Sequence, residues 1–190
     1  MKRTGLIASI VVGVCIIALL NSAPVIAQVA AGIEEDHTLA NSHAAKMVGQ
    51  WRGSGWGLGP DGRSEFEVIE RARWHLSGQS IIVQGLGTSI DPETGEIEIG
   101  HNALAIIESD QETGQVKFLA YREGQGFTES TLEFDEETGE MTWGFQPNEH
   151  ATIRFTITIE NNIWREVGHF SQDGGESWMQ FLEMTLDRVE

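Results

Sequence analysis

Residues 91–95 (Asp-Pro-Glu-Thr-Gly), 110–114 (Asp-Gln-Glu-Thr-Gly) and 135–139 (Asp-Glu-Glu-Thr-Gly) repeat one acidic pattern along the chain. In each copy the Asp side chain can accept hydrogen bonds from the backbone two residues on, and the closing Gly can adopt the left-handed conformation that returns the chain. Each copy lies between segments that can be strands. The repetition therefore predicts antiparallel hairpins, and the chain is expected to be a β-meander.

Strand-like segments continue from residue 50 to the end of the sequence and are joined by short turns. The alternation of apolar and polar residues is clearest near 151–160, where one face is expected to lie in the core and the other in water. A meander of about ten strands favours an all-β up-and-down barrel, because closure removes the exposed sheet edges. The strands are predicted near residues 50–57, 64–76, 79–90, 96–108, 115–123, 126–134, 140–146, 151–160, 163–171 and 177–188.

The beginning of the chain is typical of an export signal. Basic residues precede an apolar run over residues 6–20, and small residues favour cleavage after Ala27. An uncleaved membrane anchor is the alternative. We expect delivery to the periplasm or the exterior. The predicted parts are a signal peptide over 1–27, a linker and short helix over 28–48, and one barrel domain over 49–190.

The charge and the cysteine content exclude several classes of function. The chain has 12 basic and 29 acidic residues and a net charge of −17, which repels phosphates and anionic headgroups. Neither nucleic acid nor a membrane surface is therefore expected as a partner. The single cysteine, Cys15, falls in the predicted signal peptide, so neither a disulfide nor a thiolate metal site is expected. The usual sequence signatures of hydrolases, zinc sites and calcium loops are also missing, which favours a non-enzymatic protein without a metal.

The two ends of the barrel region resemble a known family. Residues 49–55 (Gly-Gln-Trp-Arg-Gly-Ser-Gly) follow the short helix and open the first strand. This pattern resembles the Gly-x-Trp opening of the calycin, or lipocalin-like, barrels, and in its full form it is similar to nitrobindin and related bacterial domains. The resemblance implies that a late Arg, here Arg188, packs over the Trp, here Trp51, and shuts one end of the barrel. Both residues are then structural, joined by a cation–π contact.

The same resemblance bears on cofactors. Nitrobindins hold haem through a His near the start of the last strand, and this chain has Phe181 at the most similar place. A five-coordinate ferric haem would lack its protein ligand there, so no cofactor is expected. A haem- or nitric oxide-binding protein that uses His101 or His169 as the axial ligand is the alternative.

A second motif precedes the last strand. Residues 171–178 (Ser-Gln-Asp-Gly-Gly-Glu-Ser-Trp) match the Ser-x-Asp-x-Gly-x-Ser/Thr-Trp pattern of the Asp-box hairpin. In this hairpin the Asp ties down the turn backbone and the Trp packs beneath it. We therefore expect Asp173 and Trp178 to hold the hairpin rather than a ligand.

Some side chains are predicted to face the barrel interior. His101 and His169 share strand faces with apolar residues, so both are expected to point inward, as ligand-binding or as hydrogen-bonded core groups. Arg71, Arg73 and His75 share the opposite side of their strand from Val68 and its apolar neighbours, and we expect them to face water; facing a cavity, they would hold a carboxylate. The apolar residues expected to line a filled core or a pocket are Trp74, Phe118, Trp143, Phe155 and Met184.

Taken together, the sequence favours an exported, non-enzymatic barrel that binds or carries a small apolar molecule. Three alternatives stay open. The first is the haem or nitric oxide binder, and the second is an isomerase or cyclase with His169 or Glu166 as acid and base. The third is a solid barrel that acts as a structural or interaction protein. Neither the ligand nor the oligomeric state follows from the sequence.

Overall fold

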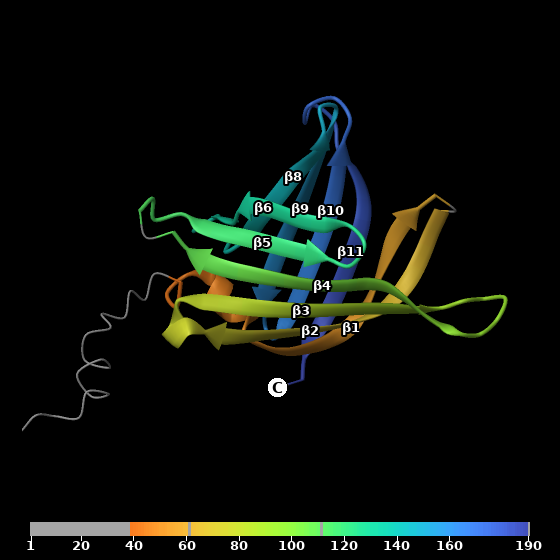
Figure 1. The fold of residues 1–190 in the computed structure, drawn as a ribbon, viewed down its shortest axis with the longest axis horizontal. Helices are drawn as coiled ribbons and strands as arrows, with labels where there is room; N and C mark the ends of the chain where they lie inside the picture. Colours follow the sequence, from red (N-terminus) through yellow and green to blue (C-terminus); the bar gives the residue numbers. More distant parts are fainter. Residues whose placement is uncertain (1–38, 61, 111, 190) are drawn as a thin grey trace, which may run out of the picture. The chain divides into compact units, whose positions relative to one another are not determined.

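The computed structural model describes residues 39–60, 62–110 and 112–189, and these form one antiparallel sheet of eleven strands that curls into a nearly closed barrel (Figure 1). Consecutive strands pair with each other except β6 and β7, which are the two ends of the sheet. The first strand pairs with the last, so the sheet order is β6-β5-β4-β3-β2-β1-β11-β10-β9-β8-β7. The predicted all-β antiparallel barrel is confirmed.

The strand boundaries lie close to the predicted ones. Two short 3₁₀-helices, η1 (His43–Met47) and η2 (Leu76–Gly78), accompany the strands. The strands are β1 (Gly49–Gly59), β2 (Gly62–His75), β3 (Ser80–Ile90), β4 (Ile97–Ser109), β5 (Val116–Arg122), β6 (Gly126–Thr131), β7 (Glu133–Phe134), β8 (Met141–Asn148), β9 (Ala151–Glu160), β10 (Ile163–Ser171) and β11 (Met179–Arg188).

The predicted strand over 126–134 is divided in two, and this division brings the ends of the sheet together. Leu132 interrupts the segment; its side chain is buried, and its backbone N–H still bonds to the Val116 carbonyl at 2.8 Å. Before Leu132 the chain pairs with β5, and after it with β8. The Gly144 N–H of β8 bonds to Ser130 Oγ of β6 at 3.1 Å across the seam. One bent segment therefore closes the barrel.

The three acidic turns fold as predicted. Asp91 Oδ1 accepts hydrogen bonds from the backbone N–H groups of Glu93 at 2.7 Å and Thr94 at 2.9 Å. Asp110 and Asp135 accept the same pair of bonds at 2.9–3.1 Å. The glycine that closes each turn has a φ of 71–74°, the left-handed region that favours glycine. These turns join β3 to β4, β4 to β5 and β7 to β8.

Trp51 and Arg188 meet at one end of the barrel, as the resemblance implied. The Arg188 guanidinium carbon lies 4.0 Å from the centroid of the Trp51 ring, which is fully buried. Trp51 Nε1 donates to the Met47 carbonyl at 2.8 Å, which ties η1 to the barrel. The Trp164 ring packs edge-on against Trp51, with 5.6 Å between the ring centroids. Together these contacts close one end of the barrel.

Of the short helix expected within residues 28–48, the described residues contain only the 3₁₀ turn η1. The predicted signal peptide and most of the predicted linker lie outside the described residues. Within the described ranges, no helix has the length and apolar character needed to cross a membrane.

Candidate ligand site inside the barrel

Three of the predicted lining residues stack on one another in the interior. The Trp143 ring lies between Phe118 and Phe155, with 4.4 Å between ring centroids on each side and interplanar angles of 23° and 16°. Phe181 packs edge-on against Phe155 at 5.7 Å. Neighbouring strands supply these rings in register, since Trp143 of β8 is paired with Phe155 of β9. The structure thus forms a continuous aromatic wall.

The other predicted interior residues lie around this wall. Met184 is buried on β11, and Trp74 is partly buried against the core. His101 lies on the inward side of β4, in line with Ala103 and Ile107, and is partly buried. Burial, and to a smaller extent the charge of Arg122, lowers the pKa of His101. Whether any of these residues binds a ligand stays a prediction.

The predicted inward orientation of His169 is wrong. His169 is paired with Arg154 of β9, and it shares the outer side of β10 with Arg165. The buried Trp164 and Glu166 occupy inward positions on β10. Ile163, at the start of the strand, is exposed, and the alternation of side chains places His169 on the same side as Ile163. Desolvation, followed by the charges of Arg154 and Arg165, lowers the pKa of His169.

Glu70 and Glu166 place two carboxyl groups inside the barrel. Glu70 lies between Val68 and Ala72 on the inward side of β2, and its side chain is 6% exposed. Its carboxyl group lies over Gly85 of β3; a Cβ atom at that glycine would stand 2.5 Å from Oε1. Glu166 is 8% exposed and lies on β10 opposite Met184 of β11. The carboxyl groups are close enough for the charge of Glu166 to act on Glu70.

Burial in this interior makes both carboxyl groups hold their protons near neutral pH. Desolvation, with a further contribution from the charge of Glu166, raises the pKa of Glu70 to about 8. Desolvation raises the pKa of Glu166 to about 7, against the opposing effect of the Trp164 and Trp143 indoles. Both carboxyl groups therefore titrate near neutral pH instead of near the ordinary value of 4.5.

The indole N–H groups of Trp143 and Trp164 lie near the Glu166 carboxyl group, where both oppose the rise in its pKa. Both act to lower the Glu166 pKa, yet neither makes a hydrogen bond of regular geometry to any described residue. Buried donors are nearly always paired in proteins, so two unpaired indoles beside a carboxyl group are an unusual feature of this interior. Glu166 thus has the Glu70 carboxyl group and two indole donors in its surroundings.

This cluster offers a defined set of interactions. The carboxyl groups can accept hydrogen bonds or exchange a proton with a guest, and the indoles can donate to it. Glu166 was considered in the sequence as an acid or base, whereas Glu70 was missed. The signal for Glu70 was available, because it has the same strand parity as Val68 and Ala72.

The outward side of β2 carries Arg71, Arg73 and His75, which are all exposed, as expected. Across the described ranges, no group of three or more His, Cys, Asp or Glu side chains gathers in an arrangement that could hold a metal ion.

The Asp-box hairpin lies between β10 and β11. Asp173 accepts hydrogen bonds from the Ser177 side chain and backbone and from the Ser171 hydroxyl, which hold its pKa well below the usual range. The Arg154 guanidinium carbon lies 4.2 Å from the centroid of the Trp178 ring. Trp178 and Arg154 also border a groove of about 330 Å³ at the seam beside β8, together with Trp143.

The comparisons with known proteins address the fold. No family model and no curated protein matches the chain. Among solved structures, an S-type phycobiliprotein lyase from Guillardia theta is similar, with a TM-score of 0.50 and 15% sequence identity over 77% of this chain and 90% of that chain. At that identity the likeness concerns the fold alone. It does not support the nitrobindin resemblance specifically, but together with the strand order it shows a lipocalin-like β-barrel.

Proposed function

We propose that this protein binds a small, largely apolar molecule in the barrel interior and that the molecule carries a hydrogen-bond donor, such as an amine. The observation that carries the proposal is the burial of two carboxyl groups, those of Glu70 and Glu166, beside an aromatic wall. A guest that donates to the carboxyl groups would relieve their desolvation. The aromatic wall would contact its apolar part.

The first experiment asks whether a guest is bound. Residues 28–190 are purified without denaturant, and the native mass is measured together with an absorption spectrum. A co-purifying mass that is lost on solvent extraction supports the proposal. The protein is then titrated with 2-phenylethylamine, ethylbenzene and 3-phenylpropionate, which share one ring and differ in charge. Tryptophan fluorescence reports binding, since Trp143 and Trp164 border the site.

The expected order of affinity is amine, then hydrocarbon, then carboxylate. The Glu166→Gln variant should lose the preference for the amine, because the neutral amide cannot hold an ammonium group. Glu160→Gln is the matched control, since Glu160 is exposed at the end of β9. Equal affinities for the three compounds in the unmodified protein, or a preference that survives in Glu166→Gln, would contradict the assignment.

The proposal includes no haem, and the positions of two side chains support this choice. Phe181, at the place where the resemblance would require a His, packs its ring against Phe155 and over Gly168. His169 lies on the outer side of the sheet. Incubation with haem followed by an absorption scan tests this point, and a Soret band that disappears in a His101→Ala variant would overturn it.

A solid barrel with a structural or interaction role is the second candidate, and the packing over the inward glycines favours it. A Cβ atom at Gly55 would stand 2.7 Å from the Phe66 ring, and one at Gly168 would stand 2.9 Å from Phe181. Side chains thus fill the space that these glycines leave. A bare polypeptide mass that stays bare with all three probes and a mixed lipid extract would select this candidate.

We also propose export to the periplasm or the exterior, on the strength of residues 1–27. Cell fractionation and the mass of the mature chain test it; a mature chain that begins at Gln28 is the expected result.

A further inference from the structure

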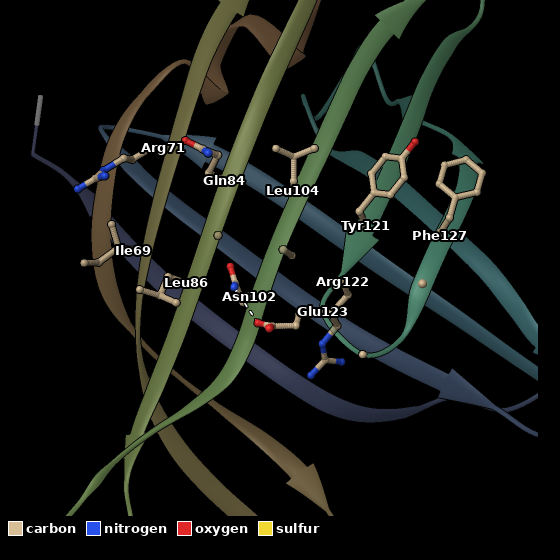
Figure 2. Close-up of a pocket in the computed structure, with 14 residues that line it drawn as sticks. Ile69, Arg71, Gln84, Leu86, Asn102, Leu104, Tyr121, Arg122, Glu123 and Phe127 are labelled. Carbon is tan, nitrogen blue, oxygen red and sulfur yellow. Dashed lines mark hydrogen bonds between the residues drawn. The ribbon is translucent and has the colours of Figure 1, made fainter.

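A hollow lies outside the barrel, on the outer face of β2–β6 (Figure 2). It is a groove of about 790 Å³, a volume typical of small-molecule sites. Paired residues of successive strands form its long side, in the order Arg71, Gln84, Leu104, Tyr121 and Phe127. These positions span four strand spacings, or about 19 Å, so the groove suits an elongated ligand.

The groove has an apolar surface that the fold does not cover. Leu86, Tyr121 and Phe127 are 38%, 45% and 52% exposed. The Tyr121 and Phe127 rings lie 5.0 Å apart and form one wall on the β5–β6 hairpin. A continuous set of exposed apolar side chains in a strongly charged chain is typical of a binding surface.

The polar groups at the groove differ in whether they have partners. Arg122 donates to Gln125 Oε1 at 3.1 Å and to the Gly100 carbonyl at 3.0 Å, and Glu123 accepts from Asn102 at 2.8 Å. These contacts fix the hairpin end of the groove.

Arg71, at the β2 end, makes no hydrogen bond or ion pair with any described residue. In a chain with 12 basic and 29 acidic residues, a cation that has no carboxylate partner is available for an anion supplied from outside. Its guanidinium group can bind a carboxylate through two parallel hydrogen bonds. Figure 2 shows Arg71 at one end of the row that leads across Leu104 to Phe127.

We propose that this outer groove is a second binding site, for an elongated amphipathic carboxylate whose head pairs with Arg71 and whose tail lies along Leu104, Tyr121 and Phe127. The site is separate from the barrel interior and does not depend on the proposed function. The preference expected for an anionic ligand is the opposite of what the net charge alone would give, because a net charge of −17 favours a cationic amphipath.

Isothermal titration calorimetry with monomeric dodecanoate, dodecan-1-ol and dodecylamine tests the proposal on the full mature chain. Dodecanoate should bind most tightly, and Arg71→Gln should weaken its binding roughly tenfold while leaving the alcohol unchanged. Arg73→Gln is the matched control, since Arg73 lies on the same strand and side but does not line the groove. Phe127→Ser, at an exposed position, should weaken the binding of both compounds.

Several results would overturn the proposal: tighter binding of dodecylamine than of dodecanoate, equal losses in Arg71→Gln and Arg73→Gln, or no loss in Phe127→Ser. A dimer in sedimentation that Phe127→Ser dissociates would also overturn it, by assigning the groove to a second copy of the chain. Glu166→Gln should leave dodecanoate binding unchanged; a loss there would place the carboxylate in the interior instead.

Discussion

At the scale of single residues, Arg188 shows how one side chain can join distant parts of the chain. Its guanidinium group lies on the Trp51 ring and donates to the carbonyls of Val48 and Lys46, while Nε donates to Asn162 Oδ1 at 3.1 Å. A cation–π contact contributes about 1 kcal/mol, and a hydrogen bond to a charged group about 1.5–3 kcal/mol. Arg188→Ala should therefore lower the free energy of unfolding by about 2–4 kcal/mol in urea titrations followed by tryptophan fluorescence.

The control for this prediction is Arg165→Ala. Arg165 bonds to Glu183 at 2.8 Å but remains 48% exposed, so its loss should cost less than about 1 kcal/mol. Equal losses of unfolding free energy in the two variants would show that Arg188 does not stabilise the closed end of the barrel. Arg188→Lys should recover only part of the loss, because an ammonium group cannot reach all three acceptors together.

At the scale of elements, the three acidic turns share one sequence pattern but differ in their surroundings. The turn after β7 lies against η1, where Glu136 is 3.5 Å from His43 and a Cβ atom at Gly139 would contact the same ring. The turn after β3 stands at the end of a long hairpin whose isoleucines, Ile90 and Ile97, are 69% and 74% exposed. Asp135→Ala should thus lower the melting temperature more than Asp91→Ala does. Thermal unfolding of the two variants measures the difference, and equal losses would contradict it.

The strands and turns also show which features of the fold could be predicted from the sequence. Turn chemistry and period-two patterns predicted the strands, because both are local. The side of a strand that faces inward is a local feature only where apolar residues alternate cleanly, as in β9. In β10 Trp164 and Glu166 occupy inward positions, so the apolar Ile163 and Val167, which share the other side of the strand, led to the wrong side for His169. Glu70 could have been found by parity, but its closeness to Glu166 depends on how the barrel closes.

At the scale of the whole molecule, the interior carboxyl pair should set the pH dependence of stability. The folded-state pKa values of Glu70 and Glu166, about 8 and 7, exceed the ordinary value of 4.5, so the folded protein binds more protons than the unfolded chain between these limits. The stabilisation is complete below about pH 4.5 and is lost as the pH rises through 7 and 8. The lowered pKa of His101 acts in the opposite direction, but its effect ends above pH 6.5.

In the ligand-free protein, the free energy of unfolding should therefore fall between pH 6.5 and 8, by up to about 1.4 kcal/mol per pH unit for each proton. Urea titrations at several pH values measure this slope, and the double variant Glu70→Gln/Glu166→Gln should be nearly flat over the same range. Two results would contradict this prediction: a stability that rises with pH in the unmodified protein, or a slope that the double variant keeps. Either result would mean that the two carboxyl groups are already ionised and hydrated in the folded protein. The argument for a guest that relieves their desolvation would then fail as well.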